Sequence, residues 1–274
     1  MTVITTDTYR IYCGDNAEYY DSVGGVQAVI TDPPYDSEVH SQERVARDEH
    51  GMVEAVPVPF ESLTSGDVHG LGRFCNGKLD GWALIFCQTE QINAWRTPLE
   101  VYGLRYFRPM LWIKPDAKPN LRGHGPGIGH ETIAAFWKSS RKQCWNGGGK
   151  VGVFYHTRAR RDGSRHPTEK PVSLMKELVR YFTNPGDTVF DPFMGAGTTG
   201  VAALELGRKF IGIERSREYF DEAKRRLEEA ARPELVFEPD TKPATLFGDA
   251  AFGSKGTRKR LQREAKEREE ASNA

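Results

Sequence analysis

Asp32, Pro33, Pro34 and Tyr35 follow a short apolar run and could together recognise a planar amine. Each proline fixes its φ angle at about −65° and lacks an N–H group, so the pair forms a stiff platform with bare backbone carbonyls. Asp32 adds carboxylate acceptors, and Tyr35 adds a π face. A carboxylate and a carbonyl can accept both hydrogens of an exocyclic amino group while the ring stacks on its plane. Amino-bearing nucleobases have this shape, although Asp-Pro and Pro-Pro also occur in ordinary turns.

A second group of residues, in the segment VFDPFMGAGTTG at 189–200, could bind a nucleoside. A strand ends at Asp191, Gly195 and Gly197 then form a tight turn, and a helix begins. Glycines let a backbone approach a ligand closely. Glu214 ends the next strand, where an acid can accept hydrogen bonds from a ribose diol. Taken alone, the pattern fits NAD, another nucleoside cofactor or a purely structural turn.

The elements that must position these residues can be read from the hydrophobic pattern. Strands are predicted at 9–13, 26–31, 82–87, 106–113 (where Pro109 marks an edge or a bulge), 131–137, 187–191 and 209–214. Helices are predicted at about 90–101, 174–182, 197–206 and from Ser216 onwards. This alternation predicts an α/β fold with a doubly wound, mainly parallel sheet. Ligands of such sheets bind outside the carboxyl ends of the strands, so we expect both groups of residues to face one crevice.

Composition limits the classes of function that remain. The chain has 274 residues, which suits one large domain or one domain with an appendage. Lys and Arg total 38, as do Asp and Glu, which excludes a globally basic nucleic-acid binder but not a basic face. No signal-peptide pattern or membrane-length apolar run is apparent, so we expect a cytoplasmic protein. The four cysteines form no CxxC pair, which favours reduced thiols and argues against a metal site.

A basic stretch at 138–170 carries nine Lys and Arg residues against two acids, with aromatic residues between them. Charge runs are usually solvated surface, but Lys and Arg can also neutralise DNA phosphates, and Arg can read guanine edges. The candidate DNA-binding residues are Lys138, Arg141, Lys142, Lys150, Arg158, Arg160, Arg161 and Arg165. By contrast, 36–70 is acidic and weakly periodic, and we expect it to be mostly a mobile loop.

The order of these segments resembles that of the S-adenosylmethionine-dependent DNA amino-methyltransferases of the N6-adenine and N4-cytosine family, in their permuted β-class arrangement. There, the catalytic Asp-Pro-Pro-Tyr precedes the cofactor motif, and a target-recognition segment lies between them. The likeness reaches from about Tyr9 to Leu227. It is carried in order by GDN at 14–16, LWIKP at 111–115, HETIAAFWK at 130–138, HPTEKPVSLMKELV at 166–179 and DPFMGAGTTG at 191–200.

This resemblance implies a Rossmann-like class I methyltransferase fold with circularly permuted motifs. It divides the chain into a catalytic half at 1–137, a small recognition insert at 138–165, a cofactor-binding half at 166–232 and a polar, charged tail at 233–274. The implied catalytic residues are Asp32, Pro33, Pro34 and Tyr35. The implied residues for S-adenosylmethionine are Asp15, Thr168, Lys170, Asp191, Pro192, Phe193, Gly195, Gly197 and Glu214. No metal is implied.

The implied reaction is transfer of a methyl group to the amino nitrogen of a base flipped out of DNA. In the family, Asp at the first motif position tends to accompany adenine and Ser tends to accompany cytosine, so Asp32 favours adenine N6. Cytosine-N4 methylation and a catalytically silent DNA-binding relative remain alternatives. Cytosine-C5 chemistry would need a nucleophilic Cys after a Pro, and no cysteine here follows one. The family includes bacterial and phage enzymes of restriction-modification systems, and many relatives are homodimers.

Overall fold

The computed structural model describes residues 2–34, 45–47, 53–55, 63–121, 125–139, 143–159 and 169–232. One compact unit contains residues 1–232, and the expected tail at 233–274 lies outside the described residues. The first part of the chain contains β1 (Thr2–Thr5), β2 (Tyr9–Cys13), α1 (Asn16–Tyr19), η1 (Tyr20–Ser22), β3 (Val26–Thr31), β4 (Val45–Arg47), β5 (Val53–Ala55), α3 (Ser65–Lys78), β6 (Leu79–Cys87), η2 (Thr89–Gln91) and α4 (Ile92–Val101). The second part contains β7 (Arg105–Ile113), β8 (His130–Lys138), β9 (Val153–Tyr155), α5 (Val172–Phe182), β10 (Thr188–Asp191), α6 (Thr198–Glu205), β11 (Lys209–Glu214) and α7 (Arg217–Ala230).

Nine of these strands form one sheet in the order β1-β2-β11-β10-β3-β6-β8-β7-β9. The strands from β2 to β6 in that order are parallel to one another. β1 is antiparallel to β2 at one edge, and β8 is antiparallel to both β6 and β7 toward the other edge. β4 and β5 pair separately. The predicted α/β fold with a mainly parallel sheet is therefore confirmed.

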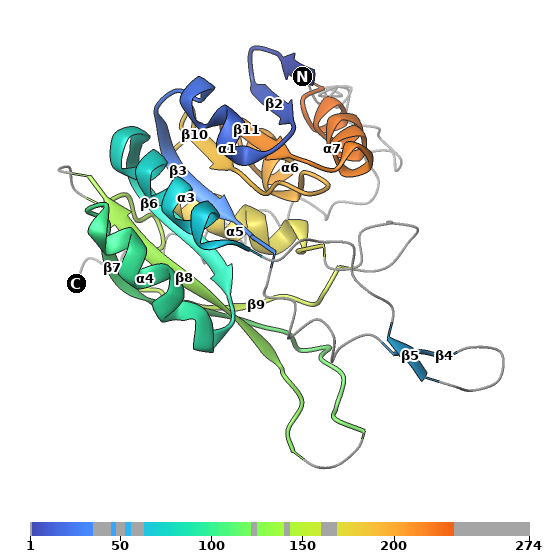
Figure 1. The fold of residues 1–274 in the computed structure, drawn as a ribbon. Coiled ribbons are helices and arrows are strands. Elements are labelled where there is room, and N and C mark those ends of the chain that lie inside the picture. Colours follow the sequence, from blue (N-terminus) through green and yellow to red (C-terminus); the bar gives the residue numbers. More distant parts are fainter. Residues whose placement is uncertain are drawn as a thin grey trace, which may run out of the picture. The chain divides into compact units, whose positions relative to one another are not determined.

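Alternate side chains of the central strands enter two separate cores. Ile30 and Leu84 belong to the core under α5, α6 and α7, whereas Val29 and Ile85 belong to the core under α3 and α4. Figure 1 shows these two groups of helices on opposite faces of the sheet. Consecutive residues of a strand face opposite sides, so a strand covered on both faces is apolar at nearly every position. This burial explains why the segments VQAVIT and WALIFC are mostly apolar and do not alternate between apolar and polar residues.

β3 and β10 lie side by side in the middle of the sheet and lead into helices on opposite faces. β10 continues through α6 to β11 on one side, and β3 continues to β6 on the other. Right-handed crossovers that depart in opposite directions must use opposite faces. A crevice therefore opens at the carboxyl ends of β3 and β10, which is where open α/β sheets bind ligands. The topology thus brings the segments after Thr31 and Asp191 together.

The seven strands predicted from the sequence are all present, as β2, β3, β6, β7, β8, β10 and β11, with small shifts at their ends. The register of β7 shifts between Tyr106 and Arg108, beside the predicted irregularity at Pro109. On the outer side of β7, β9 pairs only with Leu111–Ile113. Within the described part of the chain, no outer strand therefore requires an N–H group from Pro109, which fits the rule for proline in sheets.

The prediction of a loop at 36–70 is wrong for its last residues, because they belong to α3. Glycine is about 1 kcal/mol less favourable than alanine inside a helix, so the glycines of α3 obscure its helical pattern. Packing explains one of them, since a Cβ atom on Gly72 would lie 2.3 Å from the ring of Tyr102. A capping box between Thr64 and Asp67 starts the helix. The remaining expected loop contains β4 and β5 and otherwise lies outside the described residues up to Leu63.

Gly81 in β6 should not tolerate a side chain. A Cβ atom there would lie 2.0 Å from the backbone carbonyl oxygen of Gln27 in β3. We expect Gly81→Ala to lower the free energy of unfolding in urea by about 1–3 kcal/mol, because the two strands would have to separate. The matched control is Gly77→Ala in α3, where a Cβ atom meets nothing within 4 Å. It should be neutral or stabilising by up to about 1 kcal/mol. Equal stability of the two variants would contradict the close approach.

Candidate active site

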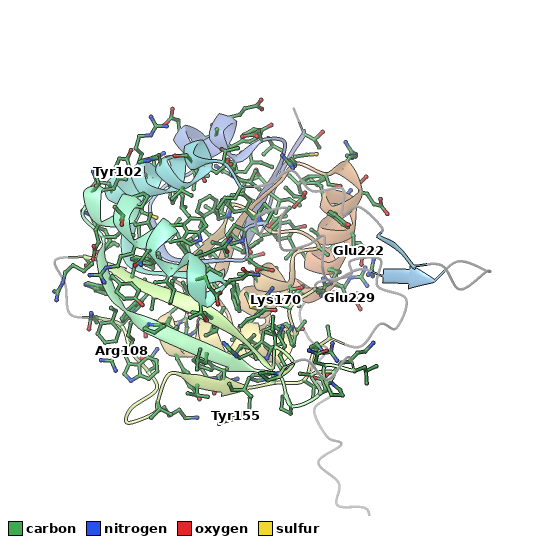
Figure 2. The ribbon with its side chains drawn as sticks, turned by 60° about the horizontal axis from the view of Figure 1, so that its bottom comes forward. Tyr102, Arg108, Tyr155, Lys170, Glu222 and Glu229 are labelled. Atoms are coloured by element: carbon green, nitrogen blue, oxygen red, sulfur yellow. The ribbon has the colours of Figure 1, made fainter. Side chains whose placement is uncertain are left out.

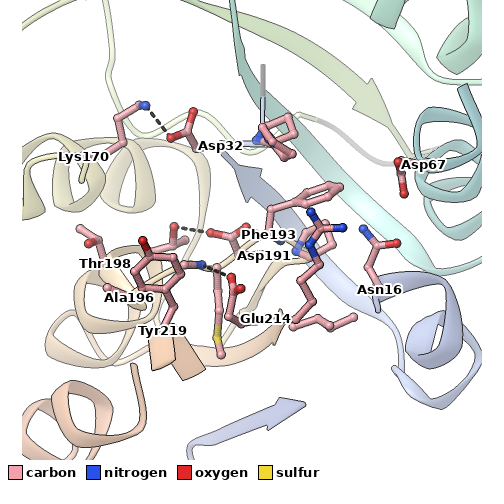
Figure 3. Close-up of a pocket in the computed structure, with 18 of the residues that line it drawn as sticks. Asn16, Asp32, Asp67, Lys170, Asp191, Phe193, Ala196, Thr198, Glu214 and Tyr219 are labelled. Carbon is pink, nitrogen blue, oxygen red and sulfur yellow. Dashed lines mark hydrogen bonds and ion pairs between the residues drawn. The ribbon is translucent and has the colours of Figure 1, made fainter. Parts of the chain in front are cut away.

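A pocket of about 1240 Å³, including its open mouth, lies at the carboxyl ends of the central strands (Figure 3). The predicted site residues that line it are Asp15, Asp32, Pro33, Pro34, Lys170, Asp191, Pro192, Phe193, Gly195 and Glu214. Gly197 does not line it; this residue caps α6 with a φ of 81° and faces Ala223. Tyr35 and Thr168 lie outside the described residues. The two motifs, far apart in the chain, thus border one cavity.

The carboxylate of Asp191 ties β10 to its neighbours. Its Oδ1 accepts hydrogen bonds from the Thr31 hydroxyl at 2.7 Å and the Phe193 backbone N–H at 3.1 Å, and its Oδ2 accepts one from the Thr199 hydroxyl at 2.7 Å. These donors are all uncharged, so burial dominates and raises the pKa of Asp191 to about 6. The side chain thereby fixes β3, the glycine turn and α6 relative to one another, although the sequence analysis assigned it to cofactor binding.

Glu214 holds the glycine turn from the other side. Its Oε2 accepts a hydrogen bond from the Gly195 N–H at 3.0 Å, and its Oε1 accepts one from the Ser216 N–H at 2.7 Å. Burial raises the pKa of Glu214 above its ordinary value. Gly195 has a φ of 52°, in the left-handed region that favours glycine. The acid at the end of β11 therefore shapes the turn and also borders the cavity.

Asp32 forms a short ion pair with Lys170. The Lys170 Nζ lies 2.5 Å from Asp32 Oδ2 and 3.1 Å from Glu131 Oε2. Figure 3 shows the ammonium and the carboxylate directed toward each other at one side of the pocket. Burial alone would lower the pKa of Lys170, but the two carboxylates raise it above its usual range. Lys170 is therefore a cation within the Asp32 environment, a role that the sequence analysis did not assign to it.

Oxygen acceptors gather on another side of the pocket, where Figure 3 shows Asn16 and Asp67. Asp15 caps α1, because its Oδ1 accepts a hydrogen bond from the Ala17 N–H at 2.9 Å. Asn16 is 6% exposed, and its Oδ1 has no hydrogen-bond partner among the described residues. Asp15 was predicted from the sequence, whereas Asn16 and Asp67 were not. The GDN segment gave the only signal for Asn16.

A second set of missed residues supports the glycine turn from α7. The Arg226 guanidinium donates to the Ala196 carbonyl oxygen at 2.8 Å and pairs with Glu169 at 2.6 Å. Glu169 also accepts a hydrogen bond from the Thr198 hydroxyl at 2.9 Å. Ala196, Glu169 and Thr198 line the pocket. No sequence pattern links these residues, because the chain brings them together from three separate elements.

Two of the predicted DNA-binding residues lie away from the pocket. Lys138 ends β8 beside Gly81, at the amino end of the parallel strand β6, and donates to Asn76. The ammonium of Lys150 lies 5.0 Å from the ring centroid of Tyr181, near the end of α5 that leads into β10. Both lysines are therefore at the edge of the sheet opposite the carboxyl ends of the central strands.

Arg158 lies at the same edge of the sheet as the pocket. It follows β9 and pairs with Asp116, which follows the carboxyl end of β7, at 3.2 Å. The other predicted DNA-binding residues, Arg141, Lys142, Arg160, Arg161 and Arg165, lie outside the described residues. Within the described ranges, no cluster of His, Cys, Asp and Glu could hold a metal ion. In the same ranges, no helix is long and apolar enough to cross a membrane.

Asp191 should make the protein less stable as the pH rises. The folded pKa is about 6, above the ordinary value, so the folded state holds the proton more tightly than the unfolded state. This contribution to the free energy of unfolding is fully present below about pH 4 and is lost as the pH rises through about 6. Relative to Asp191→Asn, the wild type should lose on the order of 1–3 kcal/mol in urea unfolding over that range. If the difference in the free energy of unfolding between the two proteins does not change with pH, the raised pKa of Asp191 is contradicted.

The sequence matches known DNA methylases over most of the described fold. The N6/N4 DNA methylase family model matches residues 26–225. Type II methyltransferase M2.DpnII of Streptococcus pneumoniae is 32% identical over 167 residues, which cover 55% of this chain and 62% of that protein. Type II methyltransferase M2.LlaDCHI of Lactococcus lactis subsp. cremoris is 33% identical over 149 residues, which cover 48% of this chain and 55% of that protein. The chain thus spans less than two thirds of the length of these relatives.

Solved structures give a similar result. The crystal structure of the M1.HpyAVI–SAM complex aligns with a TM-score of 0.63 and 27% identity, over 80% of this chain and 98% of that one. The cytosine-N4-specific PvuII DNA methyltransferase aligns with a TM-score of 0.60 and 20% identity, over 81% and 87% of the two chains, and that likeness concerns the fold alone. The predicted class I methyltransferase fold is confirmed, and the chain belongs to the N6/N4 DNA methylase family.

Proposed function

We propose that the chain transfers a methyl group from S-adenosylmethionine to the exocyclic N6 of adenine in DNA. The observation that carries this proposal is that Asp32, Pro33 and Pro34 line the same pocket as Gly195 and Glu214. Membership of the N6/N4 DNA methylase family supports amino-methyl transfer to DNA. The M1.HpyAVI structure, which is 27% identical, contains SAM and supports the choice of cofactor.

The polar groups of the pocket fit this cofactor. The acceptors of Asn16 and Asp67 on one side suit the exocyclic amine of an adenine ring. The carboxylate of Glu214 suits ribose hydroxyls. A buried acceptor without a partner costs free energy, so a ligand N–H group that reaches Asn16 Oδ1 would remove that cost. When bound, S-adenosylmethionine supplies an electrophilic methyl group on its sulfonium.

In the proposed reaction, Asp32 and Pro33 accept the two amino hydrogens of a base flipped out of the duplex. The lone pair of an aromatic amine is delocalised into its ring, so the amine is a weak nucleophile. Two acceptors favour a pyramidal nitrogen and stabilise the positive charge that develops on it. The nitrogen bonds to the methyl carbon as the carbon–sulfur bond breaks, the electron pair goes to sulfur, and one N–H proton is released. Tyr35, outside the described residues, is proposed to stack on the base.

The positions and environments of the cysteines support methyl transfer to an amino nitrogen rather than to a ring carbon. None of the four lines the described pocket. Burial raises the pKa of Cys87 to about 12 and that of Cys75 well above its ordinary value. A buried thiol with a raised pKa is a poor source of thiolate, so cytosine-C5 chemistry lacks its nucleophile. Asp32, rather than Ser, at the first motif position supports adenine over cytosine N4.

The proposed DNA contact is at the carboxyl edge of the sheet. Arg158 lies there, and we propose that Arg160, Arg161 and Arg165, which follow it in the basic insert at 138–165, contribute to the contact. We leave out Lys138 and Lys150, because both lie at the opposite edge. We also leave out Arg141 and Lys142, because the residues on either side of them, Ser139 and Cys144, bond to the amino half of β6. The proposed catalytic half at 1–137 and cofactor half at 166–232 are not separate domains, since β3 of the first pairs with β10 of the second.

The proposed function is tested by mass analysis of nucleosides from DNA that has been incubated with the protein and S-adenosylmethionine. We expect N6-methyladenine from the wild type. Asp32→Ala should reduce its formation by at least about 100-fold, because an acceptor of the amine is lost. The same variant should bind S-adenosylmethionine in calorimetry about as tightly as the wild type.

N4-methylcytosine as the product would move the assignment to the cytosine enzymes of the family. Cofactor binding without any methylated base, on DNA of mixed sequence, would support a silent DNA-binding relative. Full turnover by Asp32→Ala would remove Asp32 from the reaction.

Asn16→Leu should shift stability and cofactor affinity in opposite directions. Leucine has a similar size but no acceptor, so the variant loses the buried unpaired Oδ1 and should unfold at a higher urea concentration. Its dissociation constant for S-adenosylmethionine in calorimetry should rise about 5- to 30-fold, which corresponds to one hydrogen bond. Asn93→Leu, on the exposed start of α4, is the control and should leave the affinity unchanged. Unchanged affinity in Asn16→Leu would remove Asn16 from the cofactor site.

A further inference from the structure

We propose that Lys170 and Glu131 position Asp32 and set its charge for methyl transfer. This inference rests on the proposed function and assigns roles to two residues outside the Asp-Pro-Pro-Tyr motif. Lys170 was among the predicted cofactor-binding residues, and Glu131 was not among the predicted site residues.

Asp32 is the first of four residues whose alternating negative and positive side chains form a chain of ion pairs. Asp32 Oδ2 lies 2.5 Å from Lys170 Nζ, which lies 3.1 Å from Glu131 Oε2. Glu131 Oε1 in turn lies 2.6 Å from Lys114 Nζ. The four residues come from the end of β3, the segment before α5 (Lys170, labelled in Figure 2), the start of β8 and the end of β7. All of these segments meet at the carboxyl edge of the sheet, so the charges connect Asp32 to the part of the sheet beyond β6.

The position of Lys170 would be unfavourable without these carboxylates. Its side chain is 6% exposed, and the cation–π contact of its ammonium with Phe86, 5.2 Å from the ring centroid, offsets only part of the cost of burying the charge. It also comes just before the N-terminus of α5, where the helix dipole is positive and disfavours a cation. A buried charge with one partner removed is strongly destabilising. The burial of the Lys170 ammonium therefore costs free energy, and the fold places this cation directly against the Asp32 carboxylate.

The arrangement fixes the direction of Asp32. Lys170 holds Oδ2, so the carboxylate cannot rotate freely, and its plane is set before the target base arrives. Preorganised acceptors contribute most to stabilising a charge that develops in the transition state, because they need not reorient. A misplacement of the acceptor by about 1 Å can cost on the order of 100-fold in rate.

Glu131 keeps Lys170 from neutralising Asp32. The Lys170 ammonium is shared between two carboxylates, so it does not belong to Asp32 alone; with Lys114, the four residues sum to no net charge. The Asp32 carboxylate is the end of this chain that faces the amine, which becomes cationic as it is methylated. Lys170 and Lys114 lower the pKa of Glu131 although burial opposes this, so Glu131 remains ionised. Among the described residues, Asp191 after β10 and Cys87 at the end of β6 are further titratable groups whose pKa is influenced by Asp32.

The test compares Lys170→Met and Glu131→Gln with Lys176→Met, a matched control on α5 whose ammonium pairs with Glu205 at the surface. Single-turnover methylation is measured at saturating DNA and S-adenosylmethionine, and cofactor affinity is measured by calorimetry. Lys170→Met should slow the reaction about 100-fold, while the dissociation constant of S-adenosylmethionine changes less than about threefold. Glu131→Gln should slow it about 10-fold, and Lys176→Met should match the wild type.

The pH profile separates positioning from a purely structural role. Without its ammonium partner, Asp32 should take up a proton more readily, so the acidic limb of the rate profile of Lys170→Met should move to higher pH by about one unit or more. Lys170→Arg, which keeps the positive charge, should recover part of the rate. If Lys170→Met does not fold, Glu131→Gln and Lys170→Arg carry the same comparison.

Three outcomes would overturn the inference. The first is a wild-type rate in Lys170→Met. The second is a loss confined to cofactor affinity, with a normal rate at saturation, which would make Lys170 a cofactor contact. The third is a slowed Lys170→Met with an unshifted pH profile and no recovery in Lys170→Arg. A wild-type protein that methylates no DNA would instead overturn the proposed function, so the two failures are distinguishable.

Discussion

The hydrogen bond from the Thr31 hydroxyl to Asp191 joins residues that are 160 positions apart in the chain. It lies where β3 and β10 pair, at the point from which the sheet extends in both directions through crossovers on opposite faces. The Asp32 segment and the glycine turn both depend on this junction, because each begins where one of the two strands ends. A cavity bordered by both motifs follows from the strand order before any ligand is considered.

Burial raises the pKa of two carboxylates at this edge, but their partners make the net shifts opposite in direction. Asp191 is surrounded by uncharged donors, which satisfy its oxygens without balancing its charge, and its pKa rises. Glu131 lies between two ammonium groups, and its pKa falls although it is also buried. The difference comes from the partners and not from the depth. The environment of Asp191 suits a residue that holds neighbouring strands together. The environment of Glu131 suits a residue that remains charged beside a reaction.

The central strands could be predicted because strands covered on both faces must be apolar at nearly every position. The two motifs could be predicted because proline pairs and glycine turns constrain the backbone locally. Helix α3 was not predicted because its glycines weaken the helical pattern. One of them, Gly72, is needed for close packing against Tyr102, which is distant in sequence. The pairing of Lys170 with Asp32 spans 138 positions and leaves no local signal. The position of Lys138 at the edge of the sheet opposite the pocket could not be predicted, because a charge run does not reveal the direction of its strand.

The strand order also has a consequence for biosynthesis. β3 needs β10 as a neighbour on one side, and β10 begins only at Thr188. At roughly 5–20 residues per second, a ribosome leaves the completed β3 without that neighbour for roughly ten to thirty seconds. An apolar strand with an unpaired edge is a template for association with other chains. Shielding of this edge in the nascent polypeptide, by a chaperone or by transient contacts of its own, is therefore a condition for an adequate yield of folded protein.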